Sequence, residues 1–309
     1  MIVYDSNKNW FKDISNLARS WTMVKIVRSV IALGLYTLII CVLHVELFPE
    51  SYKTYVGSVF SLLGIVLSIL LVFRTNTAYD KWWEGRKQWG ALVNNTRNLA
   101  VYAHSQLPDS DKPIRRYLAI HISNFCLSLV DHLRNGVDLK NLIMLGEGEK
   151  KIYKSKNHIP NFVSMQIQKC LHDAYKRGEM TEADMINIRP MHQSLLDILG
   201  ACERIKKTPI PFSYSVYIKI FILAYGLMLP FALVSEMQYW AIPAVMFVFF
   251  AFIGVEMMGG EIEEPFGLDC NDLPTGTIAN TIKENVFEIL EVDMLEECKA
   301  SPEIYQKIF

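Results

Sequence analysis

Residues 56–72 read VGSVFSLLGIVLSILLV and run directly into FRTNTAYDKWWEGRKQWG at residues 73–90. The first part is apolar over the length that a helix needs to cross a bilayer, about 17 to 25 residues. The second part is crowded with charges and tryptophans, yet no glycine or proline break separates the two. We therefore expect one helix that crosses a membrane and continues into water.

The composition of the whole chain is that of a membrane protein with a substantial aqueous part. Of its 309 residues, 51% are hydrophobic, and the mean hydropathy is positive, which is high for a soluble protein. The net charge is close to zero at −1, and no basic tail or arginine-rich arm is present. Membrane lipid is therefore an expected partner and nucleic acid is not.

Four segments are long and apolar enough to cross a bilayer. They cover about residues 26–45, 56–73, 212–234 and 239–258. Lys219 lies inside the third segment and needs a partner there, because an isolated charge in lipid is costly. The pattern predicts an integral membrane protein with four transmembrane helices per subunit.

Lysines and arginines gather on one side of these spans, which predicts their orientation. They precede the first span, follow the second and precede the third, whereas the two short connectors hold Lys53 as their cation. We expect both termini, the insert at residues 74–208 and the C-terminal segment 259–309 to face the cytoplasm. The clustered cations are Lys8, Lys12, Arg19, Lys25, Arg28, Arg74, Lys81, Arg86, Lys87, Arg97, Arg204, Lys206 and Lys207.

The polar insert shows helical periodicity over most of its length. Helices with capping residues at their ends are expected at about residues 112–134, 160–178 and 181–206. The third opens on TEAD, which resembles a capping box. Residues 136–156 are expected to form a loop. Because no strand pattern is present, the predicted fold class is all-α.

The second span carries two different faces at 100° per residue. Ile65, Ile69 and Phe73 form a bulky stripe. This stripe either faces lipid or core, or forms apolar rings around a symmetry axis that gate by dewetting. Periodicity alone leaves both interpretations open. The other face consists of small residues that favour close helix packing, namely Gly57, Ser61, Gly64 and Ser68.

Two long stretches resemble the signatures of one membrane-protein family. FRTNTAYDKWWEGRKQWG at residues 73–90 and GGEIEEPFGLDCNDLPTGTIANTIKENV at residues 259–286 are similar, in that order, to the signatures of the bestrophin family in its bacterial branch. The spans and the helical insert agree over nearly the whole chain, so residues 1–309 are expected to form a single channel domain. The resemblance implies a homopentameric ion channel of the bacterial inner membrane. Its central pore would be lined by the second helix of each copy and widen into a cytosolic vestibule.

The resemblance also implies where this pore is narrow. Ile65, Ile69 and Phe73 match the neck positions of the family, which favours the pore interpretation of the stripe. Ile186 is the best match to a second constriction at the cytosolic mouth, with Ile188 as the alternative.

Charge along the pore is expected to set selectivity, since isoleucine and phenylalanine offer no ligand that replaces an ion's hydration shell. Animal bestrophins are anion channels, whereas bacterial relatives resemble cation channels. With aliphatic residues at two neck positions, we expect passive conduction of small monovalent cations, and a chloride channel of the same architecture is the alternative. The acidic groups that favour cations near the pore ends are Glu46, Glu50, Asp80 and Glu84.

The acidic stretch at residues 261–272, EIEEPFGLDCND, offers oxygen ligands that suit calcium. In animal bestrophins this segment forms a calcium clasp. Asp269 and Asp272 match two clasp carboxylates, but Leu268 stands where a third acidic ligand is expected, which predicts weak calcium binding. The alternative is that these groups cap the C-terminal helix. We expect no required cofactor.

The rival functional classes lack their sequence signatures. Neither G-x-S-x-G nor H-E-x-x-H is present, the seven histidines are dispersed, and the six cysteines form no C-x-x-C pair. The chain is therefore not expected to be an enzyme. A secondary transporter would show related pairs of spans, and the two pairs here do not resemble each other. A non-conducting membrane scaffold is the remaining alternative.

Overall fold

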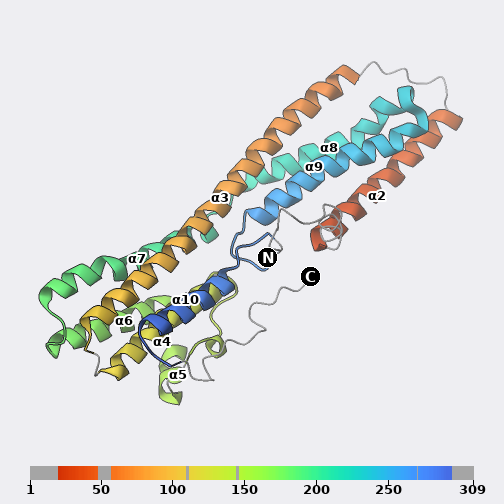
Figure 1. Cartoon of the computed structure of the whole chain (residues 1–309). Helices are drawn as coiled ribbons and strands as arrows, with labels where there is room; N and C mark the ends of the chain where they lie inside the picture. Colours follow the sequence, from red (N-terminus) through yellow and green to blue (C-terminus); the bar gives the residue numbers. More distant parts are fainter. Residues whose placement is uncertain (1–19, 48–56, 109–110, 144–145, 270, 294–309) are drawn as a thin grey trace.

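The computed structural model describes residues 20–47, 57–108, 111–143, 146–269 and 271–293, and all regular structure within them is helical (Figure 1). The predicted all-α fold class is thereby confirmed. Several residues used in the sequence analysis lie outside the described part of the chain, namely Lys8, Lys12, Arg19, Glu50 and Lys53.

Apolar helices pack together at one end of the molecule and form its membrane-spanning half (Figure 1). Three described helical stretches are long and apolar enough to cross a membrane, Trp21–Glu46, Ser58–Gln106 and Phe212–Ile262. The third stretch contains two of the four expected spans, because the chain reverses at Gln238, where φ is 49°. The spans are α2 (Trp21–Val42, extended by the π-helical turn η1, Leu43–Leu47), the first part of α3, α8 (Phe212–Met237) and α9 (Ala241–Ile262), with the 3-10 turn η3 (Gln238–Trp240) between the last two.

The long helix α3, Gly57–Gln106, joins both halves of the molecule. Its 50 residues extend over about 75 Å at 1.5 Å per residue. Leu67 and Leu71 pack into the apolar core with α2, α8 and α9, whereas Trp89 and Leu92 pack into the core of the other half. The predicted continuation of the apolar span into one uninterrupted helix is confirmed.

In the extramembrane half, the second part of α3 packs against α4, α7 and α10, and α6 packs against α4 and α7 (Figure 1). Phe125, Val163, Leu195 and Val286 are among the residues that fill its core. The elements are α4 (Lys112–His132), the 3-10 turn η2 (Leu139–Asn141), α5 (Glu147–Lys154), α6 (Ile159–Lys176), α7 (Glu182–Lys207) and α10 (Thr275–Ile289).

Local signals set the helix ends in this half. The side chain of Asp111 accepts a hydrogen bond from the amide of Ile114 and begins α4, and Thr181 and Asp184 form the expected capping box of α7. Gly136 and Gly178 adopt positive φ angles of 101° and 75° just after α4 and α6, where glycine carries no steric penalty.

The expected loop over residues 136–156 is wrong in one part, because Glu147–Lys154 forms α5. Tyr153 of this helix is fully buried and meets Phe162 of α6 edge to face, with ring centroids 5.1 Å apart. This charged segment of eight residues contains one buried aromatic, which is too few apolar positions for helical periodicity to be recognised in the sequence.

Candidate ion pathway

The candidate neck residues lie on the face of α3 that points away from the rest of the subunit. Leu67 and Leu71 are buried against the neighbouring helices, whereas Ile65, Ile69 and Phe73 are 58%, 52% and 60% exposed. Within the described chain, therefore, the stripe stays largely open. It is available to line a pore or to meet lipid or another subunit.

The small-residue face of α3 packs closely at one position. A Cβ atom at Gly64 would lie 2.9 Å from the hydroxyl oxygen of Tyr225 on α8, so glycine permits this close approach. Ser61 and Ser68, predicted to share the same packing face, are exposed within the subunit. The predicted close packing thus holds at Gly64 and does not extend to these serines within one subunit.

A buried ion pair anchors α3 where its apolar part ends. Arg74 Nη2 lies 2.7 Å from Oε2 of Glu263, directly after α9. The other oxygen of Glu263 accepts a hydrogen bond of 2.7 Å from the amide of Ile210 and lies 3.8 Å from Lys81 Nζ. Burial alone would raise the pKa of Glu263, but the Ile210 amide and Arg74 outweigh it and hold this pKa below its ordinary value. One carboxylate therefore ties α3 and α9 to the link between α7 and α8.

The two signature stretches contact each other in the fold. Trp82 Nε1 on α3 donates a hydrogen bond of 2.8 Å to the carbonyl oxygen of Asn271. A Cβ atom at Gly85 would lie 3.2 Å from Pro265 and from the Phe266 ring. The loop after α9 consequently lies directly on α3, just outside the membrane-spanning half.

The structure distinguishes the two candidates for the second constriction. Ile186, near the start of α7, is 57% exposed, whereas Ile188 is 1% exposed and packs in the extramembrane core. Ile188 therefore cannot present its side chain to a passage, and Ile186 remains the candidate.

The acidic groups that favoured cation selectivity are partly engaged within the subunit. Glu46 accepts a 2.9 Å hydrogen bond from the Tyr239 hydroxyl, and Glu84 lies 2.7 Å from Lys87 Nζ. The hydrogen bond from Lys87 lowers the pKa of Glu84, while Asp80 is exposed. Two of the acidic groups thus have local partners that reduce their pull on a passing cation.

The two candidate clasp carboxylates occupy different environments. Asp272 is buried and its Oδ2 accepts a hydrogen bond from the backbone amide of Asp269. Asp269 and Leu268 are exposed. The side chain of Asp272 thus stabilises the turn that precedes α10, but it does not cap this helix, whose N-cap residue is Pro274 and which has no side-chain cap hydrogen bond.

Lys219 has a partner of opposite charge within the membrane-spanning half. Its Nζ on α8 lies 3.7 Å from Glu256 Oε1 on α9, and Glu256 is buried. The predicted need of Lys219 for a partner is confirmed.

The fold also brings together histidines that are dispersed in the sequence. His132 and His158 both contact Glu203, from which they are 71 and 45 residues away along the chain. No local spacing pattern relates residues so far apart, so sequence inspection missed this cluster.

The architecture defines a class of membrane channel: four apolar helices, a long helix that continues out of the membrane, and an exposed apolar stripe along it. The model of the family described as bacterial/fungal bestrophin protein matches residues 1–288. The chain belongs to this bestrophin family and is a membrane ion channel rather than an enzyme.

Similar proteins and structures agree with this assignment. The voltage-dependent anion channel-forming protein of Nostoc sp. is 36% identical over 290 residues, which cover 92% of both chains. A protein of the same description from Synechocystis sp. is 33% identical over 74% of this chain and 76% of its own length. The crystal structure of a bacterial bestrophin homolog from Klebsiella pneumoniae matches with a TM-score of 0.79 at 26% identity, over 87% of this chain and 100% of that chain. The names of these relatives favour the anion alternative over the cation selectivity expected from the sequence.

Proposed function

We propose that the chain forms a passive channel for monovalent anions in the bacterial inner membrane. Five copies surround a central pore, the α3 helix of each copy lines it, and both termini and the extramembrane half lie in the cytoplasm. The observation that carries the proposal is the open apolar stripe on a helix that runs uninterrupted through both halves of the subunit.

Assembly around an axis is supported by apolar side chains that remain open beyond the membrane-spanning half. Tyr79, Trp83, Val101 and Ile186 are exposed in the single subunit, and lipid tails do not cover this region. Tyr79 and Trp83 stack on the same side of α3, with ring centroids 6.4 Å apart. Contacts between copies would bury such large apolar surfaces, which monomeric soluble proteins seldom leave in water.

The neck consists of rings of Ile65, Ile69 and Phe73. Apolar rings hold few water molecules, so a narrow neck of this kind closes by dewetting and opens when it widens or wets. Ile186 of each copy forms a second narrow ring at the cytosolic mouth.

Anion selectivity is supported by the chemistry of the exposed face of α3 as well as by the names of the relatives. Beyond Phe73, the exposed positions include the amide side chains of Asn76, Asn94 and Asn98, which can donate hydrogen bonds to an anion. An aromatic ring edge such as that of Phe73 carries positive partial charge. The exposed carboxylate of Asp80 would instead attract cations. The experiment must therefore distinguish anion from cation conduction.

Conduction in this proposal requires no cofactor. The hydrogen bond between Asp272 and the Asp269 amide supports a structural role for the acidic loop. Calcium added to the cytosolic side during the recordings below tests whether the loop also regulates the current.

The test is a planar-bilayer recording under a potassium chloride gradient with the purified protein. The expected reversal potential lies near the chloride equilibrium potential, and Ile69→Ala is expected to raise the current several-fold by widening and wetting the neck. The matched control is Ile220→Ala, since Ile220 is similarly exposed but lies on α8, and the current of this variant should equal that of wild type.

Each part of the proposal can fail separately in this recording. Reversal near the potassium potential would replace the anion proposal by the cation alternative. Equal currents from Ile69→Ala and wild type would remove the stripe from the pathway. Native mass spectrometry of the same sample measures the number of subunits, and a monomer or dimer would exclude a central pore. The same recordings show whether the current depends on voltage, as the names of the relatives state for those proteins.

A further inference from the structure

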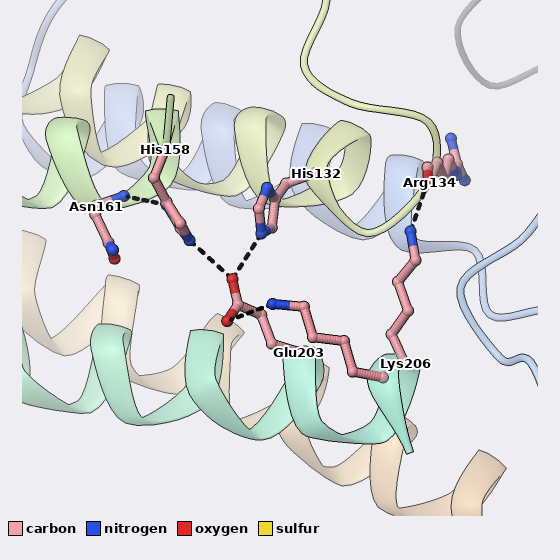
Figure 2. Close-up of polar contacts among 7 residues, drawn as sticks. His132, Arg134, His158, Asn161, Glu203 and Lys206 are labelled. Atoms are coloured by element: carbon pink, nitrogen blue, oxygen red, sulfur yellow. Dashed lines mark hydrogen bonds and ion pairs between the residues drawn. The ribbon is translucent and has the colours of Figure 1, made fainter. Parts of the chain in front are cut away.

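Three side chains in the extramembrane half converge from three different elements (Figure 2). His132 ends α4, His158 directly precedes α6, and Glu203 lies near the C-terminal end of α7. His132 Nε2 lies 2.6 Å and His158 Nε2 lies 2.8 Å from the same carboxylate oxygen, Oε1 of Glu203. Within the described part of the chain, this His132–His158–Glu203 cluster is the group of histidine, cysteine and acidic side chains whose geometry could hold a metal ion, with all three donor atoms within 4.8 Å of one another.

Neighbouring contacts hold the cluster in place. His158 Nδ1 accepts a 3.3 Å hydrogen bond from the amide of Asn161 and so caps α6, and the second Glu203 oxygen lies 3.5 Å from Lys207 Nζ. Lys206 donates a hydrogen bond to the carbonyl oxygen of Arg134 immediately after α4 (Figure 2). The ends of α4, α6 and α7 are therefore fixed around one small polar site.

The donor atoms of the cluster suit a cation. His132 and His158 each turn Nε2 toward the same carboxylate oxygen of Glu203, so two imidazole nitrogens and one carboxylate oxygen meet at a single point.

We propose that His132, His158 and Glu203 bind one divalent transition-metal ion of borderline softness, such as Zn²⁺, in each subunit. Two imidazole nitrogens and one carboxylate oxygen are ligands that Zn²⁺ and its neighbours in the first transition row prefer, whereas calcium prefers oxygen ligands throughout. The side chains are 22%, 33% and 21% exposed, so solvent can deliver the ion and a water molecule can complete a four-coordinate shell.

Only a small rearrangement separates the present geometry from a metal-bound one. Bonds of about 2.0 to 2.2 Å at tetrahedral angles separate the donor atoms by roughly 3.4 Å, compared with 2.6 and 2.8 Å between the donors now. The ion takes the place of the protons that lie between the histidines and the carboxylate. When Nε2 of His158 binds the ion, its remaining proton moves to Nδ1, so the ring gives up the hydrogen bond from the Asn161 amide. This loss weakens binding relative to a site without a capping role.

The test uses Co²⁺ as a spectroscopic probe on the detergent-solubilised full chain without a polyhistidine tag. The expected result is saturable binding of one Co²⁺ per subunit, with the intense visible absorption typical of four-coordinate cobalt, and displacement of this signal by Zn²⁺ but not by Ca²⁺. Glu203→Gln and His132→Gln should each weaken binding at least tenfold. His172→Ala is the matched control, since His172 is an exposed histidine of α6 outside the cluster, and it should bind as wild type.

Size-exclusion profiles and melting temperatures show whether each variant is folded. Zn²⁺ should raise the melting temperature of wild type and His172→Ala but not of Glu203→Gln, because the ion links three elements of the folded state. Absence of saturable binding in wild type, or binding that persists in folded Glu203→Gln and His132→Gln, would overturn the proposal. None of these readouts requires ion conduction, so the outcome is independent of the proposed channel selectivity.

Discussion

Removal of one charge from the buried pair between Arg74 and Glu263 should loosen the connection between the two halves of the subunit. The side chains are 3% and 13% exposed, so neither charge is well solvated after its partner is lost. Glu263→Gln keeps the shape of the side chain and an oxygen that can accept the Ile210 amide, and it removes only the charge. Glu264→Gln is the matched control, because Glu264 is the exposed neighbour of Glu263.

The expected effect can be sized from the geometry. At the observed 2.7 Å, Coulomb attraction is about 6 kcal/mol with an effective dielectric constant of about 20, and desolvation of both ions offsets much of it. Removing one partner of a buried ion pair typically destabilises a protein by about 3 to 5 kcal/mol. Because Glu263→Gln retains hydrogen bonds, we expect it to lower the free energy of unfolding by about 3 kcal/mol, the lower end of this range. The exposed Glu264→Gln should stay within about 0.5 kcal/mol of wild type.

Thermal unfolding of the solubilised protein, followed by tryptophan fluorescence, measures this difference. A loss of about 3 kcal/mol corresponds to a fall of about 6 to 12 °C in the melting temperature, and Glu264→Gln should shift it by no more than about 2 °C. The double variant Arg74→Met with Glu263→Met should recover much of the loss, since matched apolar replacement of a buried pair is often neutral. Equal melting temperatures for Glu263→Gln and Glu264→Gln would refute the assignment of this pair as an anchor.

Two further predictions concern packing and pH. Gly85→Val should destabilise the chain by about 1 to 3 kcal/mol, because its Cβ would lie 3.2 Å from the Phe266 ring and the added methyl groups overpack the contact. The control is Gly90→Ala, where the nearest atom to a Cβ is 3.4 Å away, and this variant should melt no lower than wild type. Equal melting temperatures for the two variants would show that the loop moves freely. Burial lowers the pKa of His192, although the hydrogen bond between its ring and the Ser164 carbonyl acts in the opposite direction. The unfolded chain therefore binds more protons than the folded chain as the pH falls below the ordinary histidine value of about 6.5, and stability present above that pH is lost on acidification. Melting temperatures from pH 7.5 to 5 should fall more steeply for wild type than for His192→Gln. Parallel curves would contradict the assignment of this acid sensitivity to protonation of His192.

The sequence was sufficient wherever one local pattern decides one element. The apolar run before Phe73 and the absence of a break after it predicted the continuous α3, and Thr181 with Asp184 predicted the start of α7. The choice between Ile186 and Ile188 for the second constriction could be made only from their burial in the structure. The two residues have the same side chain and lie two positions apart, so only the packing around them differs.

Features that depend on long-range packing were not predictable from a single chain. The partner of Arg74 lies 189 residues away, and the cluster around Glu203 joins residues from α4, from α7 and from the N-cap of α6. The expectation of cation selectivity counted acidic residues as free charges, whereas Glu46 and Glu84 have partners that appear only in the folded chain.

The shared helix constrains how such a channel can open. α3 contributes Leu71 to the apolar core and Trp89 to the extramembrane core, and the pair formed by Arg74 and Glu263 lies between these two anchors. In the proposed pore, Ile69 therefore cannot leave the axis by a local bend without straining a continuous helix. α-Helices kink chiefly at proline, at glycine pairs or at π-bulges, and the stretch from Ile65 to Arg74 contains none of these. Widening of the neck should instead require tilting or rotation of α3 as a whole, and any such motion must also move Trp89 and the helices packed around it. We therefore expect that changes in the extramembrane half, including the proposed metal binding at Glu203, are transmitted to the proposed neck through α3.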